Sequence, residues 1–246
     1  MTALDTARRV LFVHAHPDDE TLASGALILE LVDRGIECRV LTATRGERGE
    51  LVAGRFPEGL SGEAFITRRI TELTGALAEL GAGAPLFLGE TPARAPDLPS
   101  RRYEDSGMRW VREGLAGPAA DSGPASLVAA DPQEAVADLV AGIQALRHPQ
   151  GTVVITYDHA GGYGHPDHIR VHELTTSACA QLGVPLLELI SDPTADGQWF
   201  DGQRWLARLT AALDHHQTQI TVDVTQVIHS GGQREPILVR TGLRPA

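Results

Sequence analysis

Short apolar runs alternate with amphipathic stretches along most of the chain. The runs are nearly continuous in their hydrophobicity, and they cover 10–13, 38–43, 84–88, 152–157 and 184–190. Short, β-rich runs of this kind are typical of strands buried on both faces of a parallel sheet. They predict a sheet whose first strand is VLFV at 10–13.

Two stretches between these runs carry clear helix signals. In 61–81 the apolar side chains recur at alternating spacings of four and three: Ile66, Ile70, Leu73, Leu77 and Leu80. Gly81 is placed to end this helix. The second stretch begins at Asp131, which we expect to be the N-cap. Pro132 is then the first helical residue, and Glu134 the reciprocal partner of the cap.

This alternation predicts one α/β domain over 1–246, a Rossmann-like fold with a mostly parallel sheet and helices on both faces. Ligands in such folds bind beyond the carboxyl ends of the strands. Residues 89–130 form an unusually long connection, for which we expect a role as a lid or a substrate-binding insertion. Near the C-terminus we expect a helix at 204–217 and closing strands at 220–228 and 236–240, with an antiparallel edge hairpin.

Composition narrows the class of protein. A formal charge of -11 argues against nucleic acid or an anionic membrane as a partner. The two cysteines, Cys38 and Cys179, lie in apolar runs and fit buried thiols in a reducing compartment. No apolar stretch reaches 18 residues, so we expect a cytoplasmic protein. The sequence leaves open whether the chain forms a homo-oligomer.

Polar clusters follow two of the expected strands. HAHPDDE at 14–20 comes directly after the first strand, and GGYGHPDH at 161–168 comes shortly after the strand at 152–157. Together they hold four histidines and four acids. Because both strands end at the same edge of a parallel sheet, the two clusters are expected to form one site.

The chemistry of these residues points to a metal-dependent hydrolase. Imidazoles and a carboxylate are the usual ligands of catalytic Zn²⁺, and His16, Asp19 and His168 can supply them. Asp18 is then free to take a proton from the attacking water. His165 is free to stabilise an oxyanion and to protonate a leaving nitrogen.

A structural alternative exists for each cluster. Acids in the first turn of a helix gain roughly 0.3 to 1 kcal/mol each from the helix dipole, so Asp-Asp-Glu is also an ordinary helix start. His-Pro-Asp is also compatible with a turn followed by an N-cap. The joint occurrence of both clusters after two strands of one sheet favours the metal site.

The two clusters also carry a family resemblance. VHAHPDDE with GGYGHPDH resembles the PIG-L/LmbE-like family of metal-dependent N-acetylglucosaminyl deacetylases. Further stretches are similar to the mycothiol-biosynthesis members of that family: TRGERGEL at 44–51, RRITELTGALAELG at 68–81, EDSGM at 104–108 and HHQTQITV at 215–222. The resemblance implies that His16, Asp19 and His168 bind Zn²⁺, with Fe²⁺ or another divalent metal as alternatives.

The same resemblance implies roles for further residues. Asp18 is expected to be the general base, and His165 the general acid or oxyanion stabiliser. Asp167 is expected to orient a histidine, and Tyr163 to be a mobile residue near the oxyanion. Sugar or inositol contacts are expected from three more side chains: Glu50, Arg69 and Asp105.

Structural alternatives apply to these contacts as well. Arg69 and Glu72 are spaced as an exposed helical pair, and Glu50 lies in a glycine-punctuated loop where charge is usually solvated. Asp105 could cap the turn at 106–107.

The expected reaction is removal of the acetyl group from an N-acetylglucosaminyl small molecule, of the inositol type or an antibiotic-type metabolite. An amidase acting on a mycothiol-type conjugate is the nearest alternative, but Ala23 stands where the amidase branch carries a lysine. A phosphoesterase is disfavoured by the few basic residues near the motifs, and a non-catalytic sugar-binding protein by the spare Asp18 and His165. The chain has neither GxSxG nor GxGxxG after its first strand.

Overall fold

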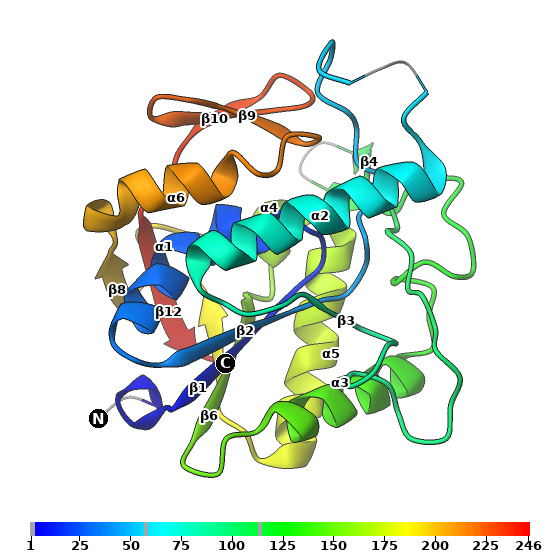
Figure 1. The fold of residues 1–246 in the computed structure, drawn as a ribbon. Helices are drawn as coiled ribbons and strands as arrows, with labels where there is room; N and C mark the ends of the chain where they lie inside the picture. The colour runs from blue at the N-terminus through cyan, green and yellow to red at the C-terminus, as the bar shows by residue number, and fades with distance from the viewer. Residues whose placement is uncertain (1–2, 57–58, 113–114) are drawn as a thin grey trace.

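A seven-stranded sheet forms the centre of the computed structural model, which describes residues 3–56, 59–112 and 115–246 (Figure 1). Its strands are β1 Arg9–His14, β2 Glu37–Thr42, β3 Leu86–Phe87, β6 Thr152–Tyr157, β7 Leu186–Leu189, β8 Gln198–Asp201 and β12 Arg240–Pro245. Their order is β3-β2-β1-β6-β7-β12-β8; the first five are mutually parallel, and β12 runs antiparallel to both of its neighbours, β7 and β8. All five runs predicted as strands therefore lie in the parallel part of the sheet.

Helices cover both faces of the sheet. They are α1 Asp19–Asp33, α2 Gly62–Leu80, α3 Pro132–Leu146, α4 Gly161–Gly164, α5 Pro166–Leu182 and α6 Leu206–Leu213, with short 3₁₀ turns η1 Ala3–Thr6 and η2 Gln203–Trp205. In β1, Val10 and Phe12 face a core shared with α1, α2 and α6, whereas Leu11 and Val13 face a core shared with α3 and α5. The strict alternation of a buried strand thus builds two cores, as the predicted fold requires.

The predicted helix boundaries are largely confirmed. Gly81 ends α2 in the left-handed conformation, with φ 77°. The side chain of Asp131 caps α3 by accepting a hydrogen bond from the Gln133 backbone N–H at 2.8 Å. The reciprocal role of Glu134 was wrong, because its carboxylate pairs with Arg94 and Arg101 of the long 89–130 segment instead.

The C-terminal strands differ from the expectation. The segment 220–228 forms β9 Ile220–Asp223 and β10 Gln226–His229, which make a separate three-stranded sheet with β11 Arg234–Pro236. Buried Ile220 and Val227 attach this small sheet to the core below α6. The antiparallel edge of the main sheet is formed by β12 and β8 instead, because Leu243 of β12 pairs with Leu189 of β7.

Much of the 89–130 segment is packed against the protein. Tyr103 is fully buried and donates a hydrogen bond from its hydroxyl to Asp138 of α3 at 2.7 Å. Leu127 and Ala130 join the same core. Within the 89–130 segment, β4 Arg109–Arg112 and β5 Leu115–Gly117 pair as two short antiparallel strands. The role of this segment as a lid or substrate-binding insertion stays a prediction.

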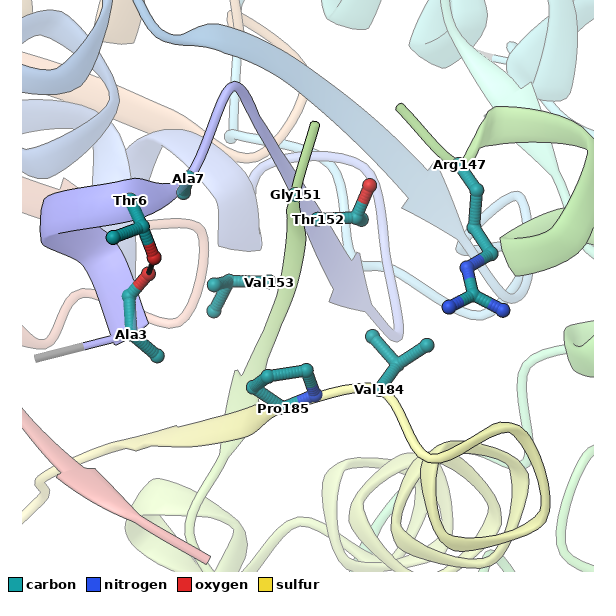
Figure 2. Close-up of a pocket in the computed structure, with 9 residues that line it drawn as sticks. All are labelled: Ala3, Thr6, Ala7, Arg147, Gly151, Thr152, Val153, Val184 and Pro185. Carbon is teal, nitrogen blue, oxygen red and sulfur yellow. Dashed lines mark hydrogen bonds between the residues drawn. The ribbon is translucent and has the colours of Figure 1, made fainter. Parts of the chain in front are cut away.

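A cavity of about 200 Å³ lies at the amino ends of the strands (Figure 2). Its walls come from η1, the connection between α3 and β6, and the residues just before β7. Among the described residues that line it, Arg147 is the only ionisable one. The polar clusters lie at the opposite edge of the sheet. Within the described ranges, no helix is long and apolar enough to cross a membrane.

Candidate metal centre

The two polar clusters meet at the carboxyl edge of neighbouring strands. β1 ends at His14 and is followed by a turn that carries His16 and leads into α1 at Asp19. β6 lies beside β1, and the chain that follows it reaches His168 in the first turn of α5. The convergence predicted from the sequence is therefore present.

Three ligand-type side chains form a compact triangle at this edge. His16 Nδ1 lies 3.3 Å from Asp19 Oδ2, and His168 Nε2 lies 3.3 Å from Asp19 Oδ1. The two ring nitrogens are 3.4 Å apart. A tetrahedral ion with bonds of about 2.0 to 2.1 Å requires ligand atoms about 3.3 to 3.4 Å apart. The three spacings are close to this value, with Asp19 making its two contacts through different carboxylate oxygens.

The other ring nitrogens of both histidines are occupied. His16 Nε2 faces Asp167 Oδ2 at 3.2 Å, and His168 Nδ1 faces the Gly161 carbonyl at 3.3 Å. Donation at those positions would leave lone pairs on His16 Nδ1 and His168 Nε2, the two nitrogens that lie 3.4 Å apart. Asp19 is oriented as well, since its Oδ2 accepts hydrogen bonds from the His16 backbone N–H and the Tyr157 hydroxyl.

Two neighbouring sets of side chains also have ligand-type atoms within 4.8 Å of one another: His16 with His165 and His168, and His16 with Asp105 and Asp167. The second set lies on the Nε2 side of His16, where its carboxylates act as acceptors. In the first set, His165 Nδ1 accepts a hydrogen bond from the Asp167 backbone N–H at 3.1 Å. His16 and His168 thus belong to more than one possible set of ligands, and the set that includes Asp19 stays a prediction.

The electrostatics of this cluster suit a cation. Burial by itself lowers the pKa of His16, but the surrounding carboxylates, Asp105 foremost, raise it well above its usual value. The pKa of Asp19 is held well below its usual range by His168 and His16, although burial opposes this. The same carboxylates that favour a proton on His16 would favour a divalent ion in its place.

Asp18 has an unusual backbone and a charged partner. Its φ of 116° and ψ of -34° are rare for a residue with a side chain. Its Oδ2 accepts a hydrogen bond from Arg69 Nη2 at 2.9 Å. Burial raises the pKa of Asp18 to about 6, with Arg69 acting in the opposite direction. Asp18 is therefore a separate carboxylate beside the triangle, free of the contacts that Asp19 makes.

His165 and Tyr163 lie on the other side of the triangle. His165 is the N-cap of α5, and its ring centroid is 4.9 Å from that of His168. Burial, together with His16 and His168, lowers the pKa of His165 to about 2. Tyr163 is 64% exposed, and its ring centroid is 6.0 Å from that of His165. The backbone around it is held by glycines with positive φ at 161, 162 and 164.

The expected substrate contacts have different surroundings. Arg69 is only 3% exposed and donates to the backbone carbonyls of Gly46 and Pro17 as well as to Asp18. The alternative of an exposed pair of Arg69 with Glu72 was wrong, because both side chains are buried.

Gly46 shows how closely Arg69 approaches the loop. With φ of 65°, a Cβ at this glycine would lie 1.7 Å from Arg69 Nη1. The glycine is therefore needed for the contact that fixes the guanidinium.

Asp105 and Glu50 complete the set of expected contacts. Asp105 is buried, and its Oδ1 lies 3.6 Å from His16 Nε2. It also receives the Gly107 backbone N–H at 2.7 Å, so its turn-capping alternative is real as well. The side chain of Glu50 is exposed, while its carbonyl accepts a hydrogen bond from Gln219 Nε2. Their roles towards a substrate stay predictions.

A cavity of about 230 Å³ opens beside these residues, between the 47–51 loop and the start of α2. Leu51, Leu60 and Phe65 supply its apolar walls, and Glu47 supplies its charged wall. Glu47 Oε2 accepts the backbone N–H of Asp105 at 3.0 Å. The cavity is thus joined to the metal-type triangle through Asp105.

Sequence reasoning missed three supporting side chains. Tyr157 donates to Asp19, accepts the Ala15 backbone N–H and stacks on His168 with ring centroids 4.2 Å apart. Its position as the last residue of the strand before the second cluster was the available signal. Asp158 accepts from Gly162 and from Ser191 and so ties the glycine-rich turn to the end of β7. His216 lies in the family-like stretch 215–222, but nothing local indicated its partner, because Glu20 is 196 residues away.

Comparison with known families places this architecture. Residues 11–179 match the family described as GlcNAc-PI de-N-acetylase (PIG-L). The chain belongs to this family. PIG-L proteins are metal-dependent N-deacetylases, which agrees with a cluster of histidines and acids that could bind a metal.

A curated PIG-L relative is the 1D-myo-inositol 2-acetamido-2-deoxy-alpha-D-glucopyranoside deacetylase of Kineococcus radiotolerans. It is 44% identical over 175 residues, which cover 71% of this chain and 45% of that protein. The chain spans about half the length of the curated relatives that it matches.

Solved structures share the fold. The N,N'-diacetylchitobiose deacetylase of Pyrococcus horikoshii has a TM-score of 0.59 at 21% identity, covering 87% of this chain and 72% of that one. GalB, the 4-carboxy-2-hydroxymuconate hydratase of Pseudomonas putida, also has a TM-score of 0.59, at 18% identity, covering 97% of this chain and 96% of that one. Because a deacetylase and a hydratase share the architecture, the fold alone does not decide the reaction.

Proposed function

We propose that this protein is a metal-dependent N-deacetylase that hydrolyses the acetamide of an N-acetylglucosaminyl small molecule, releasing acetate and a free amino sugar. The observation that carries the proposal is the triangle of His16, Asp19 and His168, with edges of 3.3 to 3.4 Å, beside a spare carboxylate and a spare imidazole. A binding protein needs the triangle but has no use for the two spare groups.

His16, Asp19 and His168 would hold Zn²⁺, and the same donors suit Fe²⁺ or another divalent ion. When bound, such an ion polarises the amide carbonyl and acidifies water. Asp167 and the Gly161 carbonyl keep the two histidines in the tautomers that expose lone pairs to the ion.

Asp18 is the general base of the proposed reaction. It collects the proton of the attacking water, and Arg69 holds its carboxylate from one side. A base with a raised pKa is better matched to neutral pH than an ordinary aspartate.

His165 stabilises the oxyanion of the proposed reaction. Because its Nδ1 accepts the Asp167 backbone N–H, the neutral ring carries its proton on Nε2. That N–H can donate a hydrogen bond to the oxygen of the tetrahedral intermediate, while the proton that Asp18 took from the water passes to the departing nitrogen. Exposed Tyr163, between glycines, is placed to approach the same oxygen.

The cavity beside Glu47 is where the rest of the substrate would extend. Glu50, Arg69 and Asp105 lie next to residues that line it and would act as contacts or supports. The Kineococcus relative is named for an inositol glycoside, which makes that compound the first substrate to test. The 89–130 segment contributes Asp105 to this side, which supports its role as a substrate-binding insertion within a single deacetylase domain.

The test is an acetate-release assay of the metal-loaded protein on a panel of N-acetylglucosaminyl conjugates that includes the inositol glycoside. We expect acetate from at least one conjugate and none after chelation. Phosphate release from phosphoester controls would instead establish a phosphoesterase. Cleavage of a mycothiol-type conjugate at an amide other than the acetamide, without release of acetate, would instead show that the protein is an amidase.

A further inference from the structure

A buried carboxylate–histidine pair lies behind Asp18, outside the set of residues assigned above. Glu20, the second residue of α1, is fully buried, and His216 is 1% exposed. His216 Nε2 lies 2.9 Å from Glu20 Oε1, which also accepts the Thr21 hydroxyl at 2.5 Å. Replacing a buried ion pair by apolar residues is often neutral or stabilising, so stability alone is weak reason to keep this one.

The second oxygen of Glu20 connects the pair to the candidate base. Glu20 Oε2 accepts the backbone N–H of Asp18 at 2.9 Å. This is the N–H of a residue with φ 116°, a conformation that persists only where surrounding contacts enforce it. Arg69 holds the carboxylate of Asp18 and the preceding carbonyl, so Asp18 is fixed from its side chain and from its backbone.

The His216 end of the pair is firmly anchored. His216 lies in the turn that joins α6 to β9. Two residues later, Thr218 donates from its backbone N–H and its hydroxyl to Glu72 of α2, at 3.1 and 2.6 Å. The Gln219 and Ile220 backbone N–H groups both donate to the His216 carbonyl. The imidazole thus comes from a turn that cannot easily follow Glu20 if the side chain moves.

We propose that Glu20 and His216 are positioning residues that hold Asp18 in its strained backbone conformation, and so set the direction of its carboxylate. His216 fixes the rotamer of Glu20, and Glu20 fixes the Asp18 N–H. The inference deepens the proposed function, because it rests on Asp18 as the base. It assigns a task to a residue far from the metal-type triangle in the sequence.

The test compares two polar substitutions of different reach. His216→Gln keeps an N–H donor at about the distance of the imidazole Nε2, whereas His216→Asn withdraws it by one methylene. We expect His216→Asn to lower kcat for acetate release by about 10- to 100-fold, the usual effect of losing a side chain that supports a functional residue without touching the substrate. KM and metal affinity should stay near wild type, and His216→Gln should retain most of kcat.

His172→Asn is the matched control. His172 Nε2 lies 2.7 Å from Glu188 Oε1, and this pair joins α5 to β7. The substitution therefore breaks another histidine–carboxylate pair, one that does not reach Asp18. It should leave kcat unchanged at a similar unfolding midpoint. Equal loss of kcat in His216→Gln and His216→Asn, or loss in His172→Asn as well, would overturn the proposal.

A double-mutant cycle separates positioning from general damage. If His216 acts through Asp18, His216→Asn should cost little further kcat in an Asp18→Asn background. The same fold loss in both backgrounds would show a role independent of Asp18 and defeat the inference.

A crystal structure of His216→Asn gives a readout that needs neither metal nor activity. We expect Asp18 to leave the region near φ 116°. An unchanged Asp18 backbone would overturn the inference even in an active enzyme. A wild-type protein that releases no acetate from any conjugate would refute the proposed function, while the Asp18 backbone would still decide the positioning role.

Discussion

The tripeptide His-Pro-Asp occurs twice, and the two copies have different tasks. At 16–18 the helix begins after the tripeptide, at Asp19, so His16 precedes the helix and Asp18 is its N-cap with a left-handed backbone. At 165–167 the helix begins within it, at Pro166, so His165 is the N-cap and accepts the Asp167 N–H. His16 therefore has a ring nitrogen available for a metal ion, whereas one ring nitrogen of His165 is used to cap the helix.

This difference of register separates the contributions of the two copies to the proposed metal site. In the first copy, His16 and the following Asp19 reach the triangle. In the second copy, the contribution comes one step beyond the tripeptide, from His168, while Asp167 turns back to support His16. The same tripeptide therefore presents different side chains in its two copies, because the helix starts at a different residue in each.

The largest effect is expected at His168. His168→Ala removes one corner of the triangle, and we expect loss of bound metal and of acetate release together. Metal content after dialysis and activity measure the two losses. His172→Ala, one turn further along α5, should keep both; bound metal in His168→Ala would show that the second copy does not supply a ligand.

Asp18 should behave in the opposite way. Asp18→Ala should retain the metal and lower kcat by about 10²- to 10⁴-fold, the usual contribution of a general base. Asp97→Ala alters another aspartate with positive φ, 64°, and should leave kcat unchanged. Near wild-type turnover by Asp18→Ala would remove the base assignment.

Asp167 should have a graded effect on the metal. Asp167→Ala takes away the acceptor of His16 Nε2, and we expect metal affinity to fall by about 10- to 100-fold. Asp167→Asn retains an oxygen acceptor and should lose less. Titration with Zn²⁺ monitored by a competing chelator measures both variants, and an order of loss reversed between them would contradict the orienting role.

The smallest effect is expected in the glycine-rich turn of the second copy. In Gly161→Ala the new Cβ would lie 2.8 Å from the Ile169 backbone N, at a φ of 63°. We expect a loss of about 1 to 3 kcal/mol in the free energy of unfolding. Gly164→Ala, with φ 90° and no atom within 4 Å, should lose less. Urea unfolding compares them, and equal losses would argue against the close packing at Gly161.

Local patterns were sufficient for the parallel strands and for two helix limits, but not for the C-terminal strands. The five parallel strands, the end of α2 at Gly81 and the cap of α3 at Asp131 each depend on hydrophobicity or turn chemistry within a few residues. The same holds for the two polar clusters, since strands that run in parallel bring their ends to one edge. Glu134 was misassigned because its partners, Arg94 and Arg101, belong to a segment with no periodic signal.

The sequence by itself determined the fold class, the family resemblance and the candidate residues for the proposed chemistry. Only the tertiary structure decided how they are held: Arg69 against Asp18, Tyr157 against Asp19, and His216 against Glu20. The physical reason is that a strand or a helix start is encoded by neighbours along the chain. The partner of a buried polar group is chosen by whichever distant segment the packed core brings within hydrogen-bond distance.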